Sequence, residues 1–177
     1  MPDCSATSIT IGGRISNVED FNTLLDAVTD DGAGIGWQYC VDRAELRQHL
    51  LDGDTEGFVC FSDNERAWGD WSVIVAACEK LRLHYCIEDD GCVGAWSPHR
   101  IYYHPETGSV EMAGGCEDHE PMFGLSTLTK WRDDGVLLDK IAERERLAIV
   151  PAFAIAPMIL TQLVKDEGET TVRGFGR

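Results

Sequence analysis

The chain has 177 residues, 44% of them hydrophobic, which suits one folded domain with a buried core and argues against a disordered protein. Its 31 acidic residues outnumber its 15 basic residues, so the formal net charge is −16 at pH 7. A field of this sign repels nucleic acid and anionic membranes and attracts basic partners, which excludes ordinary DNA binding.

The N-terminal segment predicts a strand followed by a helix. Residues 8–11 alternate between polar and apolar side chains, which indicates a short strand closed by Gly12 and Gly13. Ser16, with Glu19 three residues later, has the pattern of a capping box and predicts the start of a helix. Its apolar stripe at helical spacing comprises Val18, Phe21, Leu24, Leu25 and Val28.

The next segment predicts a second helix, a buried strand and a third helix. Asp42 and Glu45 repeat the capping pattern for a shorter helix that we expect to stop at Gly53. The continuous apolar run of residues 57–61 is typical of a buried central strand. Residues 66–82 then carry apolar side chains on one helical face.

Three further strands follow. Residues 83–87 are predicted to form the strand after the third helix, and strand, helix and strand in this order indicate a right-handed parallel crossover. Residues 100–103 and 109–113 are predicted as two short strands. The Pro and Gly of the intervening HPETG sequence favour a hairpin turn.

After residue 120 the pattern becomes helical. Helices are predicted over residues 126–134, 136–147 and 158–166. The expected fold class is α+β: a mixed sheet of about five short strands with helices packed on it, followed by a helical C-terminal part. We expect an acidic sheet domain over residues 1–120 and a charge-neutral part over residues 121–177 that packs on it or mediates dimerisation.

The cysteines and the apolar runs bear on the location of the protein. The seven cysteines include no CxxC pair, several lie in apolar runs, and the N-terminus has no signal-peptide pattern, so we expect reduced thiols in a cytoplasmic protein. The longest apolar run, residues 147–160, contains two prolines and is shorter than the roughly 20 residues of a membrane-spanning helix. We interpret it as core or as an oligomer interface, and expect no membrane association.

The segment GGCEDHEPMFG, residues 114–124, has three interpretations: half of a metal site, an acid/base centre, or a solvated acidic loop. The spacing of Cys116 and His119 suits zinc, which prefers four nitrogen or sulfur ligands, although the wider spacing matches no usual zinc framework. Crowded carboxylates beside His119 could do general acid/base work if they were sheltered from water. The candidate zinc ligands are Cys92, His99, His104, Cys116 and His119.

The acidic residues are the strongest functional signal. Residues 1–120 hold 23 acids and 7 bases, whereas residues 121–177 hold 8 of each. A net charge of magnitude about 2–8 is enough to keep a small domain soluble, so the excess motivates a binding hypothesis. The candidate partner-binding residues are Asp52, Asp54, Glu56, Asp63, Glu65, Glu88, Asp89, Asp90, Trp96, Glu117, Asp118 and Glu120.

The sequence therefore favours a cytosolic, non-enzymatic binding or inhibitor protein that engages a basic protein surface. Carboxylates on a rigid domain can imitate a phosphate array, as small acidic inhibitors of restriction or CRISPR effectors do, so the expected partner includes a nucleic-acid-binding protein. The alternative is a small zinc-dependent enzyme or module that uses the Cys/His cluster of residues 92–119. A homodimer through the apolar run of residues 147–160 is a further expectation.

Overall fold

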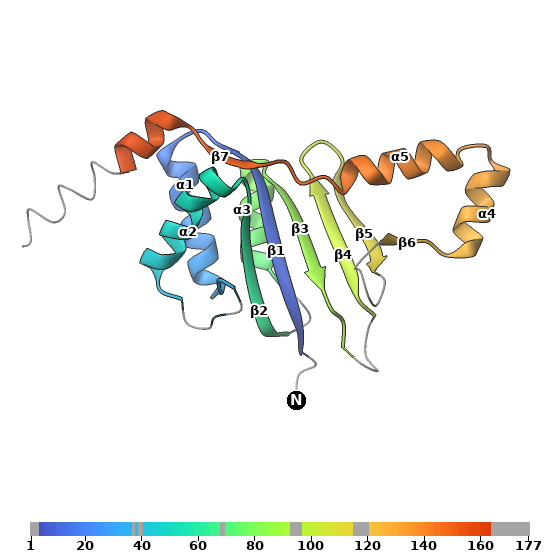
Figure 1. The fold of residues 1–177 in the computed structure, drawn as a ribbon, viewed down its shortest axis with the longest axis horizontal. Helices are drawn as coiled ribbons and strands as arrows, with labels where there is room; N and C mark the ends of the chain where they lie inside the picture. Colours follow the sequence, from blue (N-terminus) through green and yellow to red (C-terminus); the bar gives the residue numbers. More distant parts are fainter. Residues whose placement is uncertain are drawn as a thin grey trace, which may run out of the picture.

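The structure is a computed structural model that describes residues 4–36, 38, 41–67, 70–92, 97–114 and 121–163. It confirms the predicted α+β class (Figure 1). The strands are β1 (Cys4–Ile15), β2 (Val59–Ala67), β3 (His84–Asp89), β4 (His99–His104), β5 (Gly108–Gly114), β6 (Pro121–Met122) and β7 (Phe153–Ile155). The helices are α1 (Val18–Asp30), α2 (Arg43–Glu56), α3 (Ser72–Leu81), α4 (Leu125–Asp133) and α5 (Leu137–Leu147), and residues 157–163 are also helical.

The sheet has the strand order β2-β1-β3-β4-β5-β6, and β7 pairs with the end of β1. Neighbouring strands are antiparallel except for β1 and β7, which are parallel. The predicted crossover is present in a split form. Strands β2 and β3 run in the same direction and are joined through α3, but β1 lies between them and is antiparallel to both.

Strand β1 is much longer than the predicted strand of residues 8–11, and the two glycines do not close it. Its last residues, Gly13 to Ile15, pair with Phe153 to Ile155 of β7. The crossing chain comes so close that a methyl group on Gly12 would lie 1.9 Å from the carbonyl oxygen of Pro151. Gly12 is therefore a point of close approach rather than a strand end.

The first two helices begin and end near the predicted positions, with two corrections. Asn17, not Ser16, caps α1, because its side chain accepts a hydrogen bond from the Asp20 amide at 2.7 Å. Helix α2 has the predicted Asp42 capping box but continues past Gly53. A methyl group at Gly53 would lie 2.1 Å from Cγ2 of Val59, so this glycine allows helix and strand to pack closely.

Helix α3 starts at Ser72, six residues after the predicted start. Arg66 belongs to β2, where it pairs with Ser5 of β1. Carboxylates bind the first amides of α3: Asp70 accepts from Ser72 at 2.9 Å, and Asp31 accepts from Ile74 at 3.0 Å. These side chains satisfy donors that have no partner within the helix, which is why it begins there.

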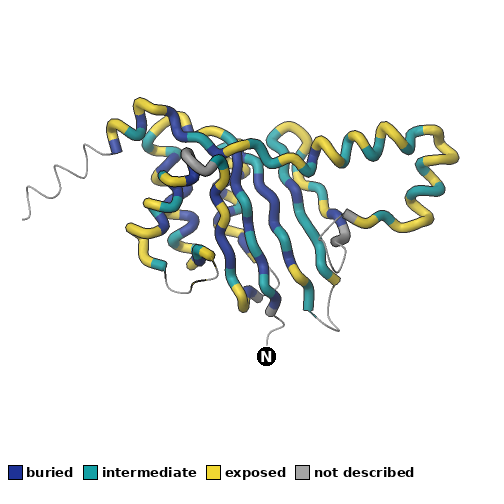
Figure 2. The backbone as a smooth tube through the Cα atoms, in the orientation of Figure 1, coloured by how far each residue is buried: buried dark blue, intermediate teal, exposed yellow. Residues whose placement is uncertain are grey.

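The main core lies between the sheet and helices α1 to α3, which cover one face of it (Figure 2). The predicted stripe of α1 faces this core: Phe21, Leu24, Leu25 and Val28 are buried. On the opposite face, a small cluster of Cys86, Tyr102 and Met112 packs against Ala148 and Val150. The predicted hairpin of β4 and β5 is also present.

The C-terminal part contains the predicted helices but is not wholly separate from the sheet. β6 and β7 both join the sheet, and Phe153, Ile155 and Ile159 are buried in the main core. The apolar run of residues 147–160 thus serves largely as core. Within the described residues, no helix is long and apolar enough to cross a membrane.

Candidate functional site

The solvent side of α1 carries a line of carboxylates. Glu19, Asp26 and Asp30 are exposed and lie seven and four residues apart, which places them within about 40° of one another around the helix. The helix contains no lysine or arginine. Phe21 and Leu24 on the opposite side of α1 are buried in the core. The three carboxylates therefore face solvent.

Helix α2 adds further exposed carboxylates and also an exposed base, Arg43. Asp42, Glu45 and Asp52 are exposed. The two helices are joined by an ion pair of 2.5 Å between Arg43 and Asp26, both well exposed. We call the following set the acidic helix face: Glu19, Asp26, Asp30, Asp42, Glu45 and Asp52.

Three of the predicted partner-binding residues are at least partly buried and have internal partners. Asp63 is half-buried, 3.4 Å from Arg66. Glu88 forms a 3.0 Å ion pair with Arg100 on the face of the sheet opposite α1 to α3. Asp89 is 1% exposed and accepts a hydrogen bond from Ser5 at 3.0 Å, so we leave it out of any contact surface.

Among the other predicted carboxylates, Glu65 and Asp90 lie on either side of Ala6 of β1 at one end of the sheet. Glu65 and Asp90 are exposed, on β2 and just after β3, while Asp52 is exposed on α2. Asp54 and Glu56 belong to the last turn of α2. Trp96, Glu117, Asp118 and Glu120 lie outside the described residues. The described members therefore do not form one continuous surface, and only Asp52 belongs to the acidic helix face.

The predicted zinc ligands do not converge in the part of the chain that the structure describes. His99 and His104 are the first and last residues of β4, so they are about 17 Å apart along the strand and point to opposite faces of the sheet. These two histidines therefore cannot bind the same ion. No group of three or more metal-binding side chains occurs among the described residues, and Cys116 and His119 lie outside them.

A buried cluster of side chains surrounds Arg66. The Arg66 guanidinium lies 3.7 Å from the centre of the Trp71 ring and pairs with Asp31 and Asp63. It also donates to the main-chain oxygens of Asp31 and Asp70. Burial raises the pKa of Asp31 from its ordinary value, against the opposing effects of the Ile74 amide and Arg66. The cluster joins β2, α1 and α3, and we assign it a structural role.

The opposite face of the sheet also carries titratable groups, but their chemistry is unsuited to nucleophilic catalysis. Burial raises the pKa of the Cys86 thiol to about 12, and it raises the pKa of Tyr102. The Arg100 pKa is also raised: burial opposes its charge, but a hydrogen bond to Tyr102 and the charge of Glu88 outweigh that effect. At neutral pH the thiol and the phenol therefore stay protonated.

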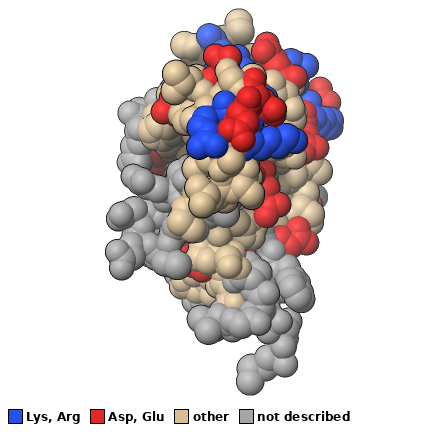
Figure 3. Space-filling model, turned by 90° about the vertical axis from the view of Figure 1, so that its right-hand side faces the viewer, with Lys and Arg blue, Asp and Glu red and all other residues tan. Residues whose placement is uncertain are grey.

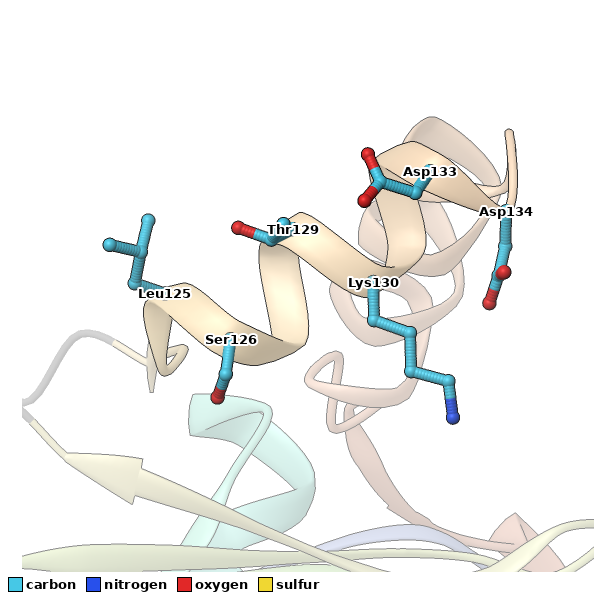
Figure 4. Close-up of a pocket in the computed structure, with 6 residues that line it drawn as sticks. All are labelled: Leu125, Ser126, Thr129, Lys130, Asp133 and Asp134. Carbon is cyan, nitrogen blue, oxygen red and sulfur yellow. The ribbon is translucent and has the colours of Figure 1, made fainter.

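One hollow lies along α4 (Figure 4). Leu125, Thr129 and Asp133 follow one another along one side of the helix, and Ser126, Lys130 and Asp134 along the adjacent side. Five of the six described lining residues belong to this helix and the sixth, Asp134, caps its end, whereas small-molecule pockets are enclosed by several elements. We therefore interpret the hollow as an open helix surface.

Comparison of the chain with known protein families, with curated proteins and with solved structures found no match. The geometry alone therefore supports the assignment of a site. The sequence interpretation missed most of the acidic helix face because it looked for acids adjacent in sequence. The available signal was the helical spacing of Glu19, Asp26 and Asp30.

Proposed function

We propose that the protein is a non-enzymatic binding protein that engages a basic protein surface through its acidic helix face. The observation that carries this proposal is the line of Glu19, Asp26 and Asp30, exposed on one side of a helix that has no base. Exposed charges of one sign steer a partner of opposite charge and speed association.

The rigid helix also supports competition with nucleic acid. At about 1.5 Å per residue, the carboxylates of α1 lie roughly 10 Å and 6 Å apart along the helix axis, so they form an ordered array of negative charge. A basic groove that binds phosphates would accept such an array. The proposed partner is therefore a basic protein of the nucleic-acid-binding class. We place the protein in the cytoplasm, since four described cysteines are free thiols, as expected in a reducing compartment.

The test uses core histones as a defined basic probe and measures their affinity by fluorescence anisotropy. We expect binding that weakens steeply as salt rises, because the Debye length falls from about 30 Å at 0.01 M to about 8 Å at 0.15 M. Duplex DNA added to the complex should displace the protein. Affinity that is indifferent to salt would contradict the electrostatic proposal.

A matched pair of variants locates the contact. One combines Glu19→Gln, Asp30→Asn and Asp52→Asn on the acidic helix face. The other makes the same change in net charge on α4 and α5, with Asp133→Asn, Asp134→Asn and Asp139→Asn. We expect the first to weaken binding by about tenfold or more and the second to have little effect. Equal losses would show that only the net charge matters.

A further inference from the structure

Helices α4 and α5 lie crosswise to one another and together project beyond the sheet (Figure 1). We call Leu125–Leu147 the helical arm. Helix α4 has no buried residue, and in α5 only Leu147 is buried. Helices of 9 and 11 residues are marginal in water without tertiary packing. The arm therefore has more apolar surface than its own contacts cover.

Each helix of the arm exposes apolar side chains. Leu125 is 80% exposed on α4, and Leu138 is 79% exposed on α5. Ala142 is also exposed and follows Leu138 at a spacing of four residues, which places the two on one side of α5. This pattern is typical of a helix face that packs against another helix.

The charge of the arm distinguishes it from the rest of the protein. Five acids and five bases lie between residues 125 and 147, whereas residues 1–120 have a net charge of −16. Figure 3, which views the molecule from the side of the arm, shows acidic and basic side chains next to one another. A surface of mixed charge can meet an identical surface without net repulsion, which a two-fold symmetric contact requires.

We propose that the helical arm binds the arm of a second copy of this chain in a two-fold symmetric, four-helix contact that buries Leu125 and Leu138. The contact keeps the two acidic bodies apart, because α5 alone is about 16 Å long and the Debye length at physiological salt is about 8 Å.

The rest of the C-terminal part is less suited to this role. Phe153, Ile155 and Ile159 of the apolar run are already in the core. Met158 is 75% exposed, but Figure 1 places its helix at the opposite end of the molecule from the arm. This inference does not depend on the proposed function, which uses the acidic helix face.

The first test is sedimentation velocity of the full chain over a hundredfold range of concentration. We expect a reversible monomer–dimer equilibrium. Raising the salt from about 0.01 M to 0.15 M should strengthen the dimer, because the Debye length falls from about 30 Å to about 8 Å and the repulsion between the acidic bodies is then screened, while the apolar contact remains. Binding of the basic probe weakens with salt, so the two interactions can be told apart. A monomer at all concentrations, or a dimer that dissociates as salt rises, would overturn the proposal.

The second test uses variants of exposed residues, which leave the core intact. Leu125→Asp and Leu138→Asp should each raise the dissociation constant of the dimer by about tenfold or more. Met158→Asp is the matched control, with the same change at a similarly exposed residue, and should leave it unchanged. Circular dichroism and thermal unfolding verify that each variant is folded. If only the Met158 variant weakens the dimer, the arm is not the interface.

Discussion

Arg66 and Asp31 form an ion pair that joins β2 to the C-terminal end of α1, although their side chains are only 9% and 8% exposed. Asp31 also binds the Ile74 amide in the first turn of α3, while Arg66 stacks on Trp71. One pair of charges therefore connects a strand and two helices. Removing Arg66 leaves the Asp31 carboxylate buried without its cation, whereas removing Asp31 leaves Arg66 with Asp63 alone.

We expect Arg66→Met to destabilise the protein by about 3–5 kcal/mol, because it leaves the Asp31 carboxylate uncompensated. Urea unfolding followed by circular dichroism measures the change. Arg43→Met is the control, since the Arg43–Asp26 pair is exposed and should contribute no more than about 1 kcal/mol. Equal effects of the two substitutions would show that the buried cluster has no special role.

Acidification should destabilise the fold through His84. Its ring lies 4.6 Å from that of His104, and burial together with His104 lowers the pKa of His84 from 6.5. A lowered folded-state pKa gives stability that is fully present above about pH 6.5 and is lost as the pH falls through the folded value. Between pH 8 and pH 5, the melting temperature should fall less in His84→Gln than in the natural protein. If the melting temperatures of the two proteins fall equally with pH, His84 is not responsible for the loss of stability.

Gly53→Ala should destabilise the protein, although alanine is normally about 1 kcal/mol better than glycine inside a helix. The added methyl group would meet Cγ2 of Val59, so we expect a loss of about 1–3 kcal/mol from overpacking. Val59→Ala removes the obstructing methyl groups. In a double-mutant cycle, Gly53→Ala should therefore be much less harmful in the Val59→Ala background, and strictly additive effects would contradict the close packing.

The thiols should differ in reactivity. Cys60 is exposed, whereas Cys78 is 0% exposed and Cys86 is 6% exposed. Burial raises the pKa of all three thiols, so access of the reagent to the sulfur, rather than the thiolate fraction alone, distinguishes Cys60. Iodoacetamide followed by peptide mass spectrometry should label Cys60 in the folded protein and the other two only after denaturation. Equal labelling of Cys78 under native conditions would mean that α3 is not packed as described.

Local patterns predicted the helices well because capping and amphipathic spacing are properties of adjacent residues. The Asp42 capping box and the buried stripe of α1 are examples. The errors arose where distant segments meet. Gly12 and Gly53 were interpreted as ends of elements, yet each makes room for a chain segment that the local sequence does not contain.

The placement of individual carboxylates was less predictable for the same reason. Glu88, Asp89 and Asp90 are adjacent in sequence, but one forms an ion pair, one is buried and one is exposed. Strand alternation sends neighbours to opposite faces, and which face is covered depends on where α1 to α3 pack. Their availability to a partner is thus a property of the tertiary structure.

The position of β1 has a consequence for the order of folding. It is the first strand to be synthesised, yet Gly13 to Ile15 pair with Phe153 to Ile155, which emerge from the ribosome more than a hundred residues later. Loop closure over so long a segment is slow relative to local hairpin formation. While the chain is being made, β1 can pair with β2 and β3 but not yet with β7. The nascent protein therefore passes through a stage in which the C-terminal end of β1 is open, and that end closes only after Phe153 to Ile155 have been made.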